Sequence, residues 1–397
     1  MRVLLDVSAV PPRPVGAGVY TIAIARGMSV RRDVDMHLLT RRGDVARWRE
    51  LAPTAELHPL APNRRPTRLA WEQAAGPRVA HRIRPEVWHG PHYTMPLRSA
   101  VPTVVAMHDL TFFDHPEWHE HAKVVYFRRM IAAAARRAAV IVTGSHDAAA
   151  GLRARFRPGG DIVVIHHGVD HARFAPTRDD DGADLALLAR HGIERPYVAF
   201  ASTIEPRKDV PTLVRAFSRI AAAHRDLQLV VAGGDGWGVA DARAAIAASG
   251  VATRILRPGY VDNATLAALF RRAEVIAYPS LVEGFGMPAL EALASGTPLV
   301  TTSGSALEEV VGDAALLVPP ADPDALAHAL STVLDDATVS ARLRAAGPVR
   351  AATFTWERSI DAHVEAYRHA IERGAVDRRG SGGRADGHGG IGTAVPG

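Results

Sequence analysis

Two glutamates, Glu283 and Glu291, lie eight positions apart around a short glycine-containing loop, and their spacing is the first sign of chemistry in this chain. Carboxylates accept paired hydrogen bonds from vicinal hydroxyl groups, so one could hold a sugar and the other a ribose. The glycines between them permit a tight loop, and Pro288 suits the first position of a helix. Free amides at that helix start would form a cradle for an anion. The segment therefore predicts a site that binds hydroxyl groups and an anion together.

Two adjacent basic residues, Arg207 and Lys208, follow an expected buried strand over 197–201. Fixed cations stabilise negative charge that develops on a departing phosphate, and they can replace a metal ion in that role. Alone, such a pair is more often solvated than functional. In combination with the glutamate loop, the pair predicts a diphosphate ligand.

His108 ends an expected strand over 103–107 and is followed by Asp109. A histidine at a strand end can act in a site or can be a structural residue with satisfied hydrogen bonds, and the sequence leaves both readings open. The nearby histidines His115, His119 and His121 are expected at the surface or on a lid over an acceptor.

Glycine loops follow one strand in each half of the chain. Gly16 and Gly18 come after an expected strand over 2–8, but Thr21 stands where a dinucleotide fingerprint requires its third glycine. Gly233 opens the turn that follows an expected strand over 227–232, and a plain turn is an equally good reading there.

Buried strands alternate with helical segments along both halves of the chain, which is typical of parallel sheets covered by helices. In the first half the expected strands are 2–8, 35–40, 87–88, 103–107, 140–143 and 162–165. In the second half they are 197–201, 227–232, 255–257, 275–278, 298–302 and 315–318. The second half thus repeats the α/β architecture of the first.

The composition along the chain predicts five parts, which are an N-terminal domain, a linker, a C-terminal domain, a final helix that crosses back to the first domain, and a disordered tail. Their expected bounds are 1–175, 176–195, 196–355, 356–373 and 374–397. The linker contains Asp179, Asp180 and Asp181, which could suggest a metal site. No histidine or carboxylate lies near them at ligand spacing, so a solvated turn is expected and no metal.

The chain has 397 residues, no cysteine and a net charge of +5. The missing cysteines exclude disulfides and thiolate metal sites. No nucleic-acid-binding signature accompanies the positive charge, so no nucleic-acid partner is expected. An arginine-rich loop expected at 64–68 and an arginine-rich helix expected over 123–137 could attract an anionic acceptor or a membrane surface, although solvated charge explains them as well. Without a signal peptide or an 18-residue apolar run, we expect a cytoplasmic protein, with contact to the inner face of the membrane left open.

The string from Glu283 to Glu291 closely resembles the paired-glutamate motif of the retaining glycosyltransferase family 4. The likeness extends over nearly the whole chain, including the segment 203–210 with Lys208, the His108 segment and the Gly16 loop. It implies the GT-B fold, in which two Rossmann-like, doubly wound parallel-sheet domains face a cleft. The His-Asp pair is found particularly in mannosyl-type members.

The resemblance also implies roles for individual residues. Glu291 would hold the donor ribose, Glu283 would contact the donor sugar near its reacting carbon, and His108 would face that sugar. The remaining donor contacts would come from Gly16, Gly18, Arg207, Lys208, Gly233, Tyr260, Gly284, Phe285, Gly286 and Met287. Many members carry an arginine where this chain has Thr203, so the role of Arg207 follows from the resemblance less directly than that of Lys208.

The resemblance predicts a metal-independent, retaining hexosyltransferase with no cofactor beyond its nucleoside-diphosphate sugar. His108, Glu283 and Lys208 are the expected catalytic residues. The donor could be GDP-mannose or UDP-glucose, and the acceptor could be a sugar or a lipid-linked sugar in glycan, glycolipid or envelope polysaccharide synthesis. Two alternatives remain at this stage: a nucleotide-sugar epimerase of the same fold, and a noncatalytic nucleotide-sugar-binding module.

Overall fold

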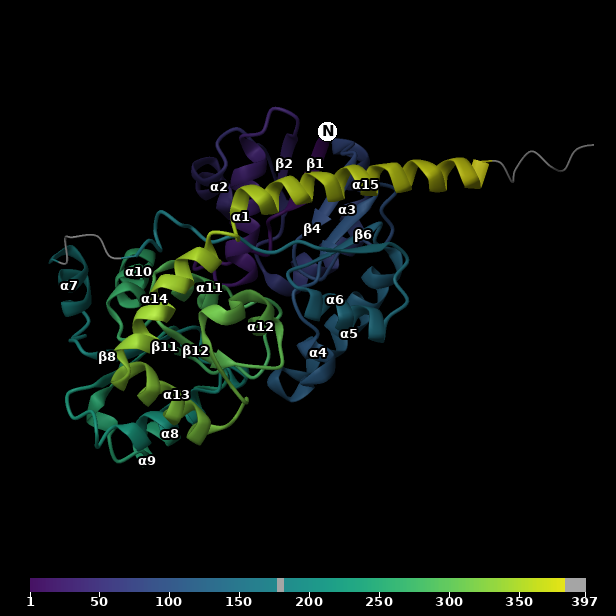
Figure 1. Cartoon of the computed structure of the whole chain (residues 1–397). Coiled ribbons are helices and arrows are strands. Elements are labelled where there is room, and N and C mark those ends of the chain that lie inside the picture. The colour runs from purple at the N-terminus through teal and green to yellow at the C-terminus, as the bar shows by residue number, and fades with distance from the viewer. Residues whose placement is uncertain (177–181, 383–397) are drawn as a thin grey trace, which may run out of the picture.

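The computed structural model describes residues 1–176 and 182–382, and it contains two parallel sheets flanked by helices (Figure 1). The first sheet has the strand order β3-β2-β1-β4-β5-β6-β7, and the second has the order β10-β9-β8-β11-β12-β13. In both, the order reverses beside the first strand, so the loops at the carboxyl ends of the strands open a crevice there. The doubly wound α/β fold expected from the sequence is confirmed.

All twelve expected strands form, and apolar side chains bury most of them on both faces, as parallel strands covered by helices require. The first sheet contains β1 (Arg2–Asp6), β2 (Asp35–Arg41), β3 (Glu56–Ala61), β4 (Val87–Gly90), β5 (Thr103–Ala106), β6 (Val140–Thr143) and β7 (Asp161–Val164). The second contains β8 (Tyr197–Ala201), β9 (Gln228–Ala232), β10 (Ile255–Gly259), β11 (Val275–Tyr278), β12 (Leu299–Thr302) and β13 (Leu316–Val318).

Helices cover both sheets. Those that follow strands of the first sheet are α1 (Ala17–Ser29), α2 (Val45–Leu51), α3 (Arg65–Ile83), α4 (Thr111–Asp114), α5 (His121–Arg137) and α6 (His146–Arg155). Those of the second half are α7 (Gly182–Ala189), α8 (Val210–Ile220), α9 (Val239–Ala248), α10 (Asn263–Arg272), α11 (Met287–Ala294), α12 (Ala306–Val311), α13 (Pro323–Asp335), α14 (Ala337–Ala351) and α15 (Trp356–Gly382).

Two local expectations in the first half were wrong. Strand β3 was not expected, because it lies at the sheet edge, carries Pro59 and alternates polar and apolar residues instead of forming an apolar run. The arginine-rich segment 64–68 was expected as a loop, but α3 begins at Arg65, with Pro66 in its first turn. Proline tolerates that position because the amide it lacks has no partner within the helix.

The expected linker 176–195 is not a free connection. Its helix α7 packs on α10, where Asp184 accepts two hydrogen bonds from Arg271 and one from Arg272. The chain already enters the second core at Val169, so it crosses between the halves close to residues 165–169. The Asp179–Asp181 turn, for which no metal was expected, lies outside the described residues.

Helix α15 returns to the first half and lies along it, as expected for the final helix (Figure 1). It continues past Arg373, where the sequence predicted its end, to Gly382. Gly374 allows this, because a β-carbon there would lie 2.3 Å from Pro102 Cγ, and glycine lets the helix pass over the β4–β5 connection. Residues 374–382 of the expected disordered tail belong to α15, and residues 383–397 lie outside the described part of the chain.

Among the described residues, no helix combines the length and the apolar composition that a membrane span needs.

Candidate functional site

The carboxylate of Glu283 lies between the two predicted cations. One oxygen pairs with Lys208 Nζ, and the other lies 2.7 Å from Arg207 Nη1. Arg207 Nε also pairs with Glu205 at 3.0 Å. Because Glu283 follows β11 and the two cations follow β8, the neighbouring pair of strands at the centre of the second sheet brings them together.

Burial and charge act in opposite directions on Glu283. Burial alone would raise the pKa of its carboxyl, but the positive charges of Arg207 and Lys208 hold that pKa well below its ordinary value. Burial, together with the charge of Arg207, lowers the pKa of Lys208 to about 8, although Glu283 opposes this change. The cluster is therefore a buried arrangement of opposite charges with a lysine that can lose its proton just above neutral pH.

Two residues that were not predicted as site residues hold Glu283 in place. The hydroxyl groups of Tyr278 and Ser280 donate hydrogen bonds to Glu283 Oε1 at 2.8 and 2.7 Å. Both residues belong to the strand-and-loop segment that leads to Glu283, so their spacing of five and three residues was a signal in the sequence. These hydroxyls satisfy acceptor sites that burial would otherwise leave unpaired.

The loop after Glu283 leads into α11 as predicted. Gly286 has a φ of 96° and precedes the helix, Met287 is its first residue, and no side chain caps the helix start. Gly286 can adopt this left-handed conformation because it lacks a β-carbon. Pro288 has no amide hydrogen and the amides of Ala289 and Leu290 donate to the Gly286 carbonyl, so the Met287 amide is the donor at this helix start that lacks a backbone acceptor among the described residues and can bind an anion.

Gly284 brings the two halves of the molecule into direct contact. A β-carbon on Gly284 would lie 1.6 Å from the carbonyl oxygen of His108. The carbonyl of Gly284 accepts a hydrogen bond of 2.9 Å from Ser145 Oγ. Beside it, the buried ring of Phe285 lies 4.7 Å from the ring of His167, measured between centroids. The glutamate loop is therefore packed against the carboxyl edge of the first sheet.

His108 lies at this contact with a defined tautomer. Its Nε2 is 2.9 Å from the carbonyl oxygen of Pro91, so Nε2 carries the proton and Nδ1 carries the lone pair. Burial lowers its pKa, which keeps the ring neutral near pH 7. Its ring also packs edge-on against Tyr20, with 5.2 Å between centroids.

Glu291 lies on α11, apart from the Arg207, Lys208 and Glu283 cluster, and is half-buried. Burial raises its pKa to about 8, and the charge of Arg173 opposes this rise while that of Asp170 adds to it. The carboxyl is therefore largely protonated near pH 7 and can donate as well as accept a hydrogen bond. The structure does not bring Glu291 into contact with the cation cluster.

The remaining predicted residues lie on loops at the same edge of the sheets. The amide of Gly233 donates to the carbonyl of Gly259 at 2.8 Å, which joins its turn to the turn that carries Tyr260. Tyr260 is exposed, and the guanidinium of Arg13 lies 5.2 Å from its ring centroid. Gly16 precedes α1 with a φ of 46°, and Gly18 packs against Pro14.

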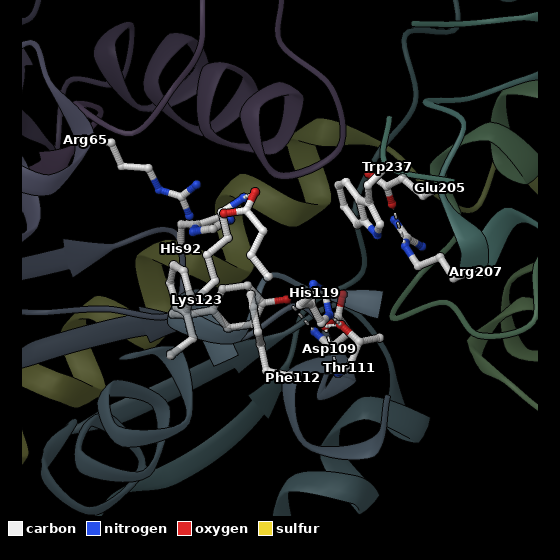
Figure 2. Close-up of a pocket in the computed structure, with 13 residues that line it drawn as sticks. Arg65, His92, Asp109, Thr111, Phe112, His119, Lys123, Glu205, Arg207 and Trp237 are labelled. Atoms are coloured by element: carbon white, nitrogen blue, oxygen red, sulfur yellow. Dashed lines mark hydrogen bonds and ion pairs between the residues drawn. The ribbon is translucent and has the colours of Figure 1, made fainter. Parts of the chain in front are cut away.

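Two cavities lie next to each other, and the smaller of them opens at the contact between the halves. The smaller, of about 250 Å³, is lined by first-half residues that include Asp109, His119 and Phe112, and by Glu205, Arg207 and Trp237 from the second half (Figure 2). Arg207 is thus the member of the cation cluster that reaches this cavity. Stacking of His119 on Phe112, with centroids 4.2 Å apart, makes an aromatic wall opposite the exposed Trp237.

The larger cavity, of about 440 Å³, lies wholly within the first half and is lined by Gly18, Asp6, Arg41, Arg65 and Arg68 among others. Arg65, His92 and Phe127 line both cavities, so the two spaces are adjacent. Among the described residues, no carboxylate forms an ion pair with Arg65 or Arg68. Burial and the charge of Arg68 lower the pKa of Arg65, as expected for a desolvated cation without a close counter-ion.

Comparison with known protein families gives two matches that together cover most of the chain. The family described as Glycosyltransferase Family 4 matches residues 14–173, and the family described as Glycosyl transferases group 1 matches residues 189–350. The two matches fall on the first and second sheets respectively.

Among curated proteins, the O-antigen chain mannosyltransferase B of Escherichia coli is 29% identical over 286 residues, which is 71% of this chain and 74% of that protein. The D-inositol 3-phosphate glycosyltransferase of Salinispora arenicola is 36% identical over 225 residues, which is 53% of this chain and 50% of that protein. The chain therefore spans about half the length of this second relative.

Solved structures share the fold over nearly the whole chain. HepE of Anabaena in complex with UDP-glucose has a TM-score of 0.75 at 20% identity, with 92% of this chain and 99% of that chain covered. Sucrose-phosphate synthase of Thermosynechococcus elongatus has a TM-score of 0.73 at 20% identity, with 96% and 99% covered.

Proposed function

Because this chain belongs to glycosyltransferase family 4 and has the GT-B fold, we propose that it is a retaining hexosyltransferase that takes its sugar from a nucleoside diphosphate. The observation that carries the proposal is the buried cluster of Arg207, Lys208 and Glu283 beside the open start of α11. Cations and helix-start amides that converge on one point bind a diphosphate, and the acidic partner can bind the attached sugar.

Donor binding changes the partners within this cluster. The diphosphate replaces the Glu283 carboxylate as the partner of Lys208 and Arg207, because its charge is greater and its oxygens are more numerous. Glu283 then accepts hydrogen bonds from sugar hydroxyls. This exchange accounts for a carboxylate that is fully ionised and held among cations before the donor arrives.

In the reaction, the bond between the anomeric carbon and the diphosphate oxygen breaks, and the acceptor oxygen forms a bond to the same carbon on the same face. The acceptor proton passes to the departing diphosphate oxygen. Lys208, Arg207 and the Met287 amide at the start of α11 stabilise the negative charge that grows on that oxygen, so no divalent metal is needed for this step. His108, with the Nδ1 lone pair, binds a sugar hydroxyl from the opposite domain.

We assign the acceptor to the first domain, in the cavity of about 440 Å³ that adjoins the cleft. Arg65 and Arg68 bring positive charge to this cavity, and burial raises the pKa of Asp6, which also lines it, although the charge of Arg68 opposes this rise. An acceptor that carries a phosphate or a carboxylate next to its reacting hydroxyl fits this charge. The mannosyltransferase relative favours mannose as the transferred sugar, and the UDP-glucose complex of HepE makes UDP-glucose the second donor to test.

The test begins with donor binding, measured as the rise in melting temperature with a panel of nucleoside-diphosphate sugars. Transfer from the stabilising donor is then followed by mass spectrometry with sugar and lipid-linked acceptors. We expect Lys208→Ala to lower kcat/KM by roughly 10²- to 10³-fold, since it removes one charge from the leaving group. The control is Arg243→Ala, which removes an exposed cation of α9 paired with Asp235.

Unchanged turnover in Lys208→Ala would refute the assignment. Conversion of the donor to an isomer without an acceptor would identify an epimerase instead. Tight donor binding without turnover against any acceptor would identify a binding module.

A further inference from the structure

A second group of chemically capable residues lies on the edge strands of the first sheet. His37 is on β2, and Glu56 and His58 are on the edge strand β3. In the register between these strands, His37 is opposite Glu56, and His58 is opposite Leu39. Because side chains alternate between the faces of a strand, His37, Glu56 and His58 all project from the same face.

The three side chains converge on one point. His37 Nδ1 lies 2.8 Å from His58 Nε2, and the Glu56 carboxylate oxygens lie 3.7 Å from His37 Nδ1 and 3.6 Å from His58 Nε2. In a tetrahedral zinc site, with metal–ligand distances near 2.0 Å, ligand atoms are separated by roughly 3.3 Å. The separation between the two histidine nitrogens is shorter than that value, and the two separations to Glu56, measured to different carboxylate oxygens, are slightly longer.

An outer carboxylate supports the geometry. The second ring nitrogen of His37, Nε2, is buried and lies 3.3 Å from Asp35 Oδ2, a contact that is within ion-pair distance but lacks hydrogen-bond geometry. Histidines that bind metals usually donate their other ring N–H to a carboxylate, which leaves the lone pair on the nitrogen that faces the metal. In His37 that nitrogen is Nδ1, the atom that points at His58 and Glu56.

We propose that His37, Glu56 and His58 form a binding site for a divalent transition metal ion of the zinc class, with Asp35 as the outer partner of His37. Two imidazoles and one carboxylate are a ligand set that zinc accepts, and water completes the coordination. The exposed Glu56 gives access from solvent, while His37 is buried. Since the chain has no cysteine, no thiolate competes for the ion.

The site is separate from the proposed transfer reaction. It lies near the amino ends of β2 and β3, opposite the carboxyl edge where the cavities open, so it leaves the metal-independent reaction unaffected. A bound ion would join the edge strand β3 to β2. Two nearby cations disfavour the binding of a metal ion. Arg2 pairs with Asp35, and the positive charge of Arg82 contributes to the lowered pKa of His58.

The test uses the full-length protein after dialysis against a chelator, with ZnCl2 and CoCl2 as probes. We expect one zinc ion per chain by calorimetry, a higher melting temperature with zinc, and visible Co²⁺ absorption typical of tetrahedral coordination. His58→Ala and Glu56→Gln should each weaken binding by at least roughly tenfold, and Asp35→Asn by roughly tenfold. The exposed Glu56→Gln variant keeps the test valid if His58→Ala fails to fold.

The control is His166→Ala. His166 pairs with Glu309 and lies near His146, in the other group of histidines and carboxylate that is close enough to bind a metal among the described residues. Binding that persists in this variant and is lost in His58→Ala supports the proposal. Zinc binding that is absent in the wild type, equal in His58→Ala, or lost only in His166→Ala would overturn it and leave a plain hydrogen bond between His37 and His58.

Discussion

At the scale of single residues, the proposed chemistry depends on Lys208, one of only two lysines in the chain. Arginine supplies nearly all the other positive charge, and it keeps that charge at any pH that the protein tolerates. A lysine can lose its proton when it is buried, and the neighbouring charge of Arg207 favours that loss. Lys208 would therefore give the proposed donor site a dependence on pH that arginine alone would not.

We expect kcat/KM for the donor to fall as pH rises through about 8. The burial of Lys208, with the charge of Arg207, lowers its pKa from the ordinary value near 10.5 to about 8, so the charge on the diphosphate loses its partner above that pH. Below about pH 8 the lysine is protonated and this limb of the profile is flat. Steady-state rates between pH 6 and roughly 10 provide the measurement.

Lys208→Arg is the matched variant for this experiment. Arginine stays charged throughout the range, so the decline near pH 8 should disappear even if the overall rate is lower. A decline that persists unchanged in Lys208→Arg would show that another group titrates.

At the scale of elements, the loop between β11 and α11 acts through its contact with the end of β5. The Gly284 backbone lies directly against the His108 carbonyl. This contact fixes the start of α11 in the second domain relative to His108 in the first domain. Ser145, which caps α6, adds a hydrogen bond to the Gly284 carbonyl. Under the proposed function, this contact would fix the distance between the donor groups and the acceptor groups.

We expect Gly284→Ala to lower kcat by roughly 10²-fold while donor binding by the second domain changes much less. The added β-carbon would lie 1.6 Å from the His108 carbonyl oxygen, which forces the domains apart at the reacting groups. The measurement compares kcat with the dissociation constant of the nucleoside diphosphate.

The control is Gly43→Ala, where the nearest atom to the new β-carbon is 3.6 Å away. That variant should match the wild type in both quantities. If Gly284→Ala retained full kcat, tight closure at this contact would not be required for transfer.

At the scale of the whole molecule, two segments join the domains side by side. The amide of Val169 donates to the carbonyl of Phe354 at 3.3 Å, and Gly168 packs directly against the backbone of Trp356. From there α15 lies against the first domain, and a buried chain of hydrogen bonds holds the helix in place. Tyr367 donates to His89, and Tyr20 donates to His363, whose other nitrogen donates to the carbonyl of Ser359.

We expect Tyr367→Phe to reduce the free energy of unfolding by about 1–2 kcal/mol, because it removes the buried partner of His89 Nδ1. Urea denaturation of the full chain measures the change. Tyr126→Phe is the control, since the buried hydroxyl of Tyr126 has no hydrogen-bond partner among the described residues, and its removal should cost little. Equal destabilisation by both variants would mean that the network does not hold α15.

The sequence determined the repeated α/β pattern, the family and the composition of the glutamate loop, because buried parallel strands and glycine-rich turns leave local signals. It placed Glu283, Lys208 and His108 at strand ends, and parallel strands bring such ends to one edge of a sheet. The sequence did not predict the edge strand β3 or the end of α15. Proline is unfavourable in a strand and glycine in a helix, and Pro59 and Gly374 are tolerated there only because of their neighbours in space.

Only the tertiary structure decided which residues meet. The ion pairs of Glu283 with Arg207 and Lys208, the contact of Gly284 with His108, and the grouping of His37 with Glu56 and His58 all join segments that are far apart in the sequence. Distances between such atoms depend on strand order and domain closure, which no local pattern encodes. The pKa changes follow from the same cause, because burial and neighbouring charge exist only once the chain has folded.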